Sequence, residues 1–388
     1  MVSRAKFVYV CDGLSADKMN EICGKYSADT GIRTEVLLFR QKTIDDDPLE
    51  YARFIKECSD ADAVLVRHLF APQKFRRLQR IADRLKDKTV LIHCPNADLS
   101  AAYRKLFPGS DADWNLMYLL LSDISCTDET EVIKLLANII GLASEDIRIP
   151  EKAASTGLYV KGEGLRGKEY IIIDRSRPAA GILIRTYMFR TMGTDCADML
   201  IETLEKYGVQ TVPVVFPGAS VITGGPEGAR SVFYDYFTDN GTPIVDAVIC
   251  ISPFSLLVSA GESLRDEDNF LRSLTGVPVF QTMLAQGDFL DFADMRAGAD
   301  RRTISSFTAW AELDGQIDCV PIGCMTRDAG GNALTIPLPE RIDHLSRLVR
   351  NWINLRRKEN KDKRIAVVLY QKLADCGRIG SAAGLDCA

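Results

Sequence analysis

The chain has 388 residues, of which 46% are hydrophobic and 26% are charged, and its formal net charge is -5. This composition excludes a disordered chain and a protein built of membrane spans, and the length predicts at least two domains. Because the two signs of charge are well mixed, the chain also lacks the basic character expected of a nucleic-acid binder. Small molecules or other proteins are therefore the expected partners.

The first 150 residues alternate apolar runs with amphipathic stretches, a pattern typical of βαβ units around a parallel sheet. Asp47-Pro48 predicts a helix start, with a capping residue followed by a proline at the first helical position. The predicted strands are 6–11, 34–39, 61–70 and 88–95, and the other predicted helices are 16–27, 72–86, 112–124 and 129–143. We interpret the basic side chains of helix 72–86 as a solvated face.

Apolar periodicity stops between Ile149 and Lys168, in a stretch rich in glycine and small residues. We therefore predict an N-terminal α/β domain over 1–150, a connecting segment over 151–168 and a second α/β region over 169–388. The predicted strands of this region are 179–189, 211–216, 245–252, 276–283 and 364–371, with helices at 196–208 and 338–358. The fold class is α/β, with two or more successive Rossmann/flavodoxin-like parallel-sheet units. Because no helix follows the last strand to cover it, we expect further sequence beyond residue 388.

Two glycine clusters have letters similar to those of phosphate-binding loops. Gly162–Gly167 spells GxGxxG, but a predicted strand at 169–174 follows it, whereas a dinucleotide site needs a helix there. Gly224–Gly228 lacks the Gly-Lys-Ser/Thr ending of a P-loop. We predict a flexible turn at the first cluster and no cofactor bound by a recognisable motif.

The histidines and cysteines do not predict a metal site. His68, His93 and His344 lack metal-ligand spacing. His68 and His93 lie near the C-terminal ends of predicted strands, where α/β sheets usually bind ligands, but a structural role is the favoured interpretation. The eleven cysteines include no CxxC pair, which predicts mostly buried, reduced thiols. The apolar run at the N-terminus is too short for a signal peptide or a membrane span, so we expect a cytoplasmic protein.

Four sequence segments together indicate a protein family, which composition and periodicity alone do not. They are RPAAGILIRTYMFRTMGTDCADMLIETLEKYGVQTVPVVFP, GVPVFQTMLAQGD, AWAELDGQIDCVPIG, and ERIDHLSRLVRNWINLRRKENKDKRIAVVLY with GRIGSAAGLDCA. Their sequences and order resemble the large subunits of the cobaltochelatase and magnesium-chelatase H-subunit family, over most of residues 155–388. The first domain matches mainly in layout. The resemblance is to the N-terminal part of these long subunits, so we expect this chain to lack a full active site.

The resemblance implies a subunit that binds a tetrapyrrole, cobyrinate-type or porphyrin, for insertion of Co²⁺ or Mg²⁺ in cobalamin or chlorophyll-type biosynthesis. It further implies that ATP is hydrolysed by separate AAA+ motor subunits. By motif position, the candidates for lining a ligand cleft are Arg185, Tyr187, Gln281, Glu312 and Asp314. Arg185 could pair with a ring carboxylate, and Glu312 could act as a base or a metal-transfer ligand.

Each candidate also has a structural interpretation, such as a buried arginine satisfied by carbonyls or an acid that holds a turn. Ala311 stands where the family usually has proline, and Tyr187 where a histidine is common, so the ring and the metal stay open. Two alternatives are a tetrapyrrole carrier without chelatase activity and a two-lobed small-molecule binding protein. A nicotinamide enzyme ranks last, since the GxGxxG lies in the wrong context.

Overall fold

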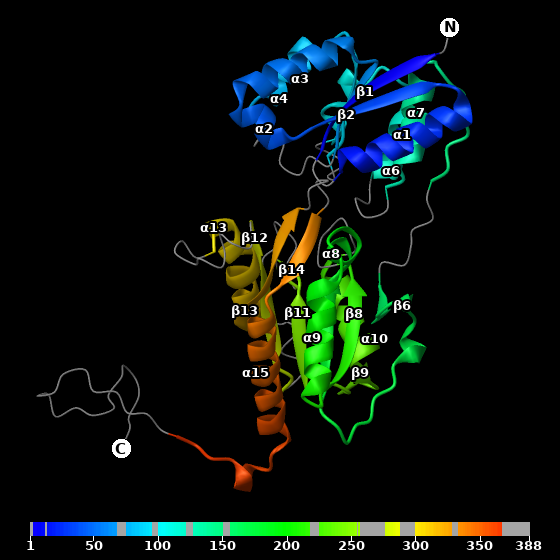
Figure 1. The fold of residues 1–388 in the computed structure, drawn as a ribbon. Coiled ribbons are helices and arrows are strands. Elements are labelled where there is room, and N and C mark those ends of the chain that lie inside the picture. Colours follow the sequence, from blue (N-terminus) through cyan, green and yellow to red (C-terminus); the bar gives the residue numbers. More distant parts are fainter. Residues whose placement is uncertain are drawn as a thin grey trace, which may run out of the picture.

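A computed structural model of the chain contains two α/β units, drawn in Figure 1. The residues that it describes are 3–11, 14–67, 75–94, 100–121, 127–149, 156–217, 225–253, 255–256, 276–287, 299–327 and 333–366. Within these ranges, no helix combines the length and the apolar character needed to cross a bilayer.

The first unit is a four-stranded parallel sheet in the order β2-β1-β3-β4. Its strands are β1 (Arg4–Val10), β2 (Arg33–Phe39), β3 (Ala63–Val66) and β4 (Thr89–Ile92). Its helices are α1 (Ala16–Thr30), α2 (Gln41–Asp46), α3 (Pro48–Asp60), α4 (Leu78–Arg84), α6 (Asp111–Leu121) and α7 (Glu129–Ile139), with a 3₁₀ turn at Arg104–Leu106. This strand order is that of a flavodoxin-like doubly wound sheet.

Local sequence explains where these helices begin and end. Ser15 caps α1 through a hydrogen bond from Lys18 N, and Gly31 ends the helix at φ 73°, a conformation that favours glycine. Asp47 accepts hydrogen bonds from the first turn of α3, which confirms the helix start predicted at Asp47-Pro48. Both faces of the sheet are covered, since Phe7 and Tyr9 pack under α1, α6 and α7 while Val8 packs under α3 and α4.

The second unit is an eight-stranded sheet in the order β14-β13-β12-β11-β7-β8-β5-β6. The five central strands, β13 to β8 in that order, are parallel, and the strands at both edges are antiparallel. The strands are β5 (Gly157–Val160), β6 (Gly164–Arg166), β7 (Ala179–Arg185), β8 (Gln210–Phe216), β11 (Ala247–Ile251), β12 (Val279–Gln286), β13 (Ile317–Arg327) and β14 (Ala333–Pro337), with a separate hairpin of β9 (Thr238–Asp239) and β10 (Thr242–Pro243).

The helices of the second unit include a π-helical turn. They are α8 (Thr186–Thr191), α9 (Asp195–Lys206), α10 (Gly225–Phe237), α13 (Arg301–Ile304), the π-helical turn Ser305–Ala309, α14 (Trp310–Asp314) and α15 (Pro339–Arg357), with 3₁₀ turns at Lys168–Tyr170 and Asn360–Asp362. In Figure 1 α9 and α15 lie side by side against the sheet, in agreement with their many contacts.

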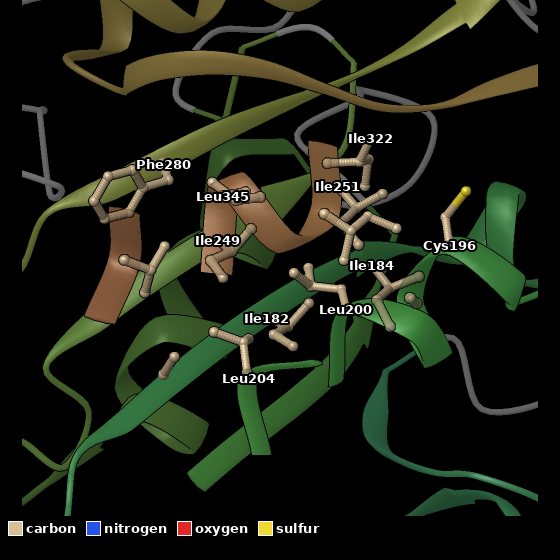
Figure 2. Close-up of a cluster of buried hydrophobic side chains, with 14 of the residues drawn as sticks. Ile182, Ile184, Cys196, Leu200, Leu204, Ile249, Ile251, Phe280, Ile322 and Leu345 are labelled. Atoms are coloured by element: carbon tan, nitrogen blue, oxygen red, sulfur yellow. The ribbon is translucent and has the colours of Figure 1, made fainter. Parts of the chain in front are cut away.

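The largest core of this unit lies between the sheet and these two helices (Figure 2). Ile182 and Ile249 of the central strands meet Leu200 of α9 and Leu345 of α15, and all four are fully buried. Burial of one such side chain stabilises the folded state by about 1.5–3 kcal/mol, so this core holds both helices on the sheet.

The structure confirms the α/β fold class with parallel sheets, and it corrects three local predictions. The strand predicted over 179–189 ends at Arg185, because α8 begins at Thr186. The strand predicted over 169–174 is a 3₁₀ turn followed by residues without strand pairing. Residues 157–166, within the predicted connecting segment, form β5 and β6 at an edge of the second sheet. Most of the strand predicted over 364–371 lies outside the described residues.

Candidate functional site

The second sheet has a topological switch point between β7 and β11. The chain runs from β7 to β8 on one side and from there to β11 on the other side. Open α/β sheets bind ligands at the carboxyl ends of strands where the order reverses in this way. Ile184 of β7 pairs with Ile251 of β11, so Arg185 and Ser252 follow at the same level of the sheet.

Arg185 is the last residue of β7, and its side chain is half-buried. Side chains alternate along a strand, so Arg185 points to the same face as Leu183, the face that α10 covers. Burial is the largest cause of a lowered guanidinium pKa, although arginine remains charged in proteins. A charged guanidinium group in this position, with its paired N–H donors, suits the binding of a carboxylate.

Gln281 lies in β12 and is 1% exposed. Its Nε2 donates a hydrogen bond of 2.9 Å to the carbonyl oxygen of Ser252, just past the end of β11. Its Oε1 is buried and finds no hydrogen-bond partner among the residues that the structure describes. Gln281 therefore holds the segment after β11 and keeps one buried acceptor.

Asp314 ends α14 and is also 1% exposed. Its carboxylate accepts hydrogen bonds from Ser255 Oγ at 2.5 Å, from the backbone N of Leu256 at 2.6 Å and from Gln316 Nε2 at 3.2 Å. Burial raises the pKa of this carboxyl group, and the three hydrogen bonds oppose that rise. The next residue, Gly315, has φ 86°, so Asp314 anchors a turn as well as the 252–256 segment.

Gln281 and Asp314 thus both bind residues that follow β11, and Arg185 ends the neighbouring strand β7 at the level of Ser252. The Cys250 thiol lies within electrostatic reach of both Arg185 and Asp314, and burial raises its pKa. Sequence reasoning missed Cys250 and the 252–256 segment. The only available signal was the position of this segment after a buried strand, because its contacts use backbone atoms and small hydroxyls.

The other two candidates lie two residues from Arg185 and from Asp314 in the sequence, and Tyr187 is also within electrostatic reach of Arg185. Tyr187 belongs to α8, not to the end of β7, and packs against the core under α9 and α15. Glu312 lies on α14, two residues before Asp314, with an exposed side chain. Because its side chain is exposed, Glu312 is accessible to a ligand.

A second buried polar cluster lies at the carboxyl edge of the first sheet. Arg67 follows β3 and forms an ion pair with Glu129 in the first turn of α7, with both side chains buried. His93 follows β4, is 2% exposed and stacks near Tyr118 at 5.3 Å between ring centroids. Burial, helped by the Arg67 charge, lowers the pKa of His93 to about 4, which keeps the imidazole neutral near pH 7.

The structure also locates most of the glycine motif, the histidines and the cysteines considered in the sequence. The GxGxxG residues cover the end of the turn before β6 and β6 itself, with Gly162 at φ 79° and Gly164 at φ 85°. His344 is exposed on α15, and His68 lies outside the described residues. Eight cysteines fall within the described part of the chain, and all are free thiols, seven of them buried. No group of three potential metal ligands occurs in that part.

Known proteins are similar to this chain over part of its length. The family model described as CobN/Magnesium Chelatase matches residues 127–388. The magnesium-chelatase H subunit of Cereibacter sphaeroides is 27% identical over 247 residues, which cover 55% of this chain and 19% of that protein. The aerobic cobaltochelatase CobN of Pseudomonas aeruginosa is 33% identical over 116 residues, or 28% of this chain and 9% of that protein.

An uncharacterized protein of Methanocaldococcus jannaschii is 28% identical over 65% of this chain and 21% of its own length. The chain therefore spans about a fifth of the length of such curated relatives. The catalytic subunit of cobaltochelatase from Mycobacterium tuberculosis superposes with a TM-score of 0.54 at 16% identity, over 98% of this chain and 29% of that one. This likeness concerns the fold.

Proposed function

Because the chain belongs to the CobN/magnesium chelatase family, we propose that it is the N-terminal part of a metal chelatase large subunit and binds a tetrapyrrole ring. The observation that supports this proposal is the position of Arg185 at the carboxyl end of β7, beside the topological switch point, level with Ser252, which Gln281 holds. The ring is of the cobyrinate type or a porphyrin, and the metal substrate is Co²⁺ or Mg²⁺.

In this proposal each group has a separate task. Arg185 pairs with a carboxylate side chain of the ring, since its planar fork matches a carboxylate. Gln281 is a positioning residue, because its Nε2 holds the carbonyl oxygen of Ser252. Asp314 is a positioning residue, because its carboxylate is already committed to Ser255 and Leu256.

Insertion of a metal ion also requires that two pyrrole protons leave the ring, so a base must lie near it. Glu312 is the candidate, as a base or as a carboxylate that passes the ion to the ring, and its exposure keeps it accessible. Tyr187 is assigned to the wall of the site from the side of α8. ATP hydrolysis belongs to AAA+ partner subunits, and we expect the complex in the cytoplasm.

Ring binding is tested by visible absorbance titration of the full 388-residue chain with a cobyrinate-type ring and with a porphyrin. Loss of a charge-assisted pair costs about 1.5–3 kcal/mol, so Arg185→Ala should weaken binding about 10- to 100-fold. The matched control is Arg166→Ala, which removes an exposed arginine on β6. Equal weakening by both variants, or no saturable binding of either ring, would count against the proposal.

The role of Glu312 is tested separately. Introduced into the complete large subunit, Glu312→Gln should leave ring affinity unchanged and slow metal insertion once the ATP-hydrolysing partners are added. Glu359→Gln, another exposed glutamate, is the control. Insertion at the wild-type rate in Glu312→Gln would remove this residue from the mechanism without affecting the assignment of Arg185.

A further inference from the structure

A tight turn joins the short strands β9 and β10, between α10 and β11 (Figure 1). Asp239 pairs with Thr242, so Asn240 and Gly241 are the two residues of the turn. Both have positive φ, 49° for Asn240 and 78° for Gly241, which is the geometry of the type I′ turn that Asn-Gly favours. Both residues are exposed, and the sequence contains an Asn-Gly pair only here.

This pair can react with itself in water. The backbone nitrogen of Gly241 attacks the Cγ atom of Asn240, which closes a cyclic imide and releases the side-chain nitrogen as ammonia. One water molecule then opens the imide. Cleavage at one carbonyl gives an aspartate, and cleavage at the other gives an isoaspartate, whose main chain runs through the former side chain. Glycine permits the attack because it has no Cβ to shield its nitrogen.

The neighbours of Asn240 determine what this reaction changes. Its Nδ2 donates a hydrogen bond of 3.0 Å to Oδ1 of Asp239. The other oxygen of Asp239 accepts a hydrogen bond of 2.6 Å from Nη2 of Arg175. Replacing the amide by a carboxylate removes a donor to Asp239 and places two negative charges side by side. Such like charges destabilise the strands that hold them.

We propose that Asn240 is a site of spontaneous deamidation and that this reaction loosens the β9–β10 hairpin. The new carboxylate repels Asp239 and competes with it for Arg175. The isoaspartate also adds one atom to the main chain, and the register of a hairpin depends on the length of its turn. Just beyond the turn, Ile244 N donates to Phe237 O at 2.8 Å, so the hairpin closes the connection from α10 to β11.

Peptide mapping by mass spectrometry of the full chain, kept folded for increasing times in mildly alkaline buffer, tests the reaction. The peptide with Asn240 should gain the mass of an amide-to-acid change and separate into two products. Asn240→Gln, with a side chain one methylene longer, should lose this change. Asn351 and Asn354 are exposed on α15 and are not followed by glycine, so they serve as internal controls. An Asn240 amide that is lost no faster than theirs would overturn the proposal.

Hydrogen exchange measures the loosening of the hairpin. Asn240→Asp supplies the carboxylate of one product, and Asn240→Gly removes the same hydrogen bond without adding charge. The amide of Ile244 should exchange about 2- to 5-fold faster in Asn240→Asp than in Asn240→Gly, and added salt should reduce the difference. Unchanged exchange in α9 shows that the fold is retained. Equal exchange of Ile244 in both variants would refute the effect of the charge on the hairpin.

Discussion

Asp246 joins three separate parts of the second unit, and its removal should destabilise that unit. The side chain is 7% exposed and lies just before β11. It accepts hydrogen bonds from Arg356 at 3.1 Å and Arg357 at 2.9 Å, at the end of α15, and from the backbone N of Ala179 at 3.1 Å. Arg357 also donates to the carbonyl oxygen of Ser176. Basic residues at the end of a helix favour its dipole, but here Arg356 and Arg357 also link the end of α15 to the starts of β7 and β11.

The size of the effect follows from this burial. Removing one partner of a fully buried ion pair costs about 3–5 kcal/mol. The two arginine side chains are 34% and 32% exposed, so water replaces part of what Asp246 supplies. We therefore expect Asp246→Ala to lower the free energy of unfolding by about 2–3 kcal/mol, to which the unpaired N–H of Ala179 contributes about 1 kcal/mol. For a unit of this size, Tm should fall by about 5–10 °C.

Urea unfolding followed by circular dichroism measures this loss, with a separate transition fitted for each α/β unit. Asp246→Asn, which keeps one carbonyl acceptor, should lose about half as much. Glu163→Gln breaks an exposed ion pair with Arg166 and should cost less than about 1 kcal/mol. If Asp246→Ala costs no more than Glu163→Gln, the cross-link does not stabilise the unit and the reasoning is refuted.

Three further predictions concern packing and pH. Gly181→Ala should cost about 1–3 kcal/mol, because the added Cβ would lie 2.7 Å from the Phe237 ring, and Gly181→Ala/Phe237→Leu should recover part of the loss in the same unfolding assay. The pKa of His93 is lowered from 6.5 to about 4, so its contribution to stability is present above pH 6.5 and is lost as pH falls through 4. The advantage of the wild type over His93→Gln in unfolding free energy should therefore shrink by up to about 3 kcal/mol between pH 7 and pH 4, and a constant gap would contradict this. The pKa of Asp314 is raised above 3.8, so its contribution to the stability of the wild type is lost as pH rises above that value. The free energy of unfolding of Asp314→Asn should therefore increase relative to that of the wild type between pH 3.5 and pH 6. A relative decrease would show that the protein stabilises the ionised carboxylate.

Apolar periodicity predicted most of the parallel strands and their helices, because those segments are buried on one stripe or on both faces. The helix predicted over 338–358, for example, is observed as Pro339–Arg357. The errors arose where an apolar run changes structure midway. Residues 186–189 continue the composition of β7, yet they form the start of α8, since burial against one core suits either a strand or a helix.

The site shows a different limit. Family resemblance supplied the candidate side chains, but their roles depend on partners that leave little trace in a sequence. Gln281 bonds to a carbonyl oxygen and Asp314 to a backbone N–H, and every residue type except proline could provide both atoms. The sequence alone therefore does not distinguish the roles of the two neighbouring acids, Glu312 and Asp314. Asp314 is committed to residues after β11 and supports the fold there, whereas the exposed Glu312 stays accessible to a ligand.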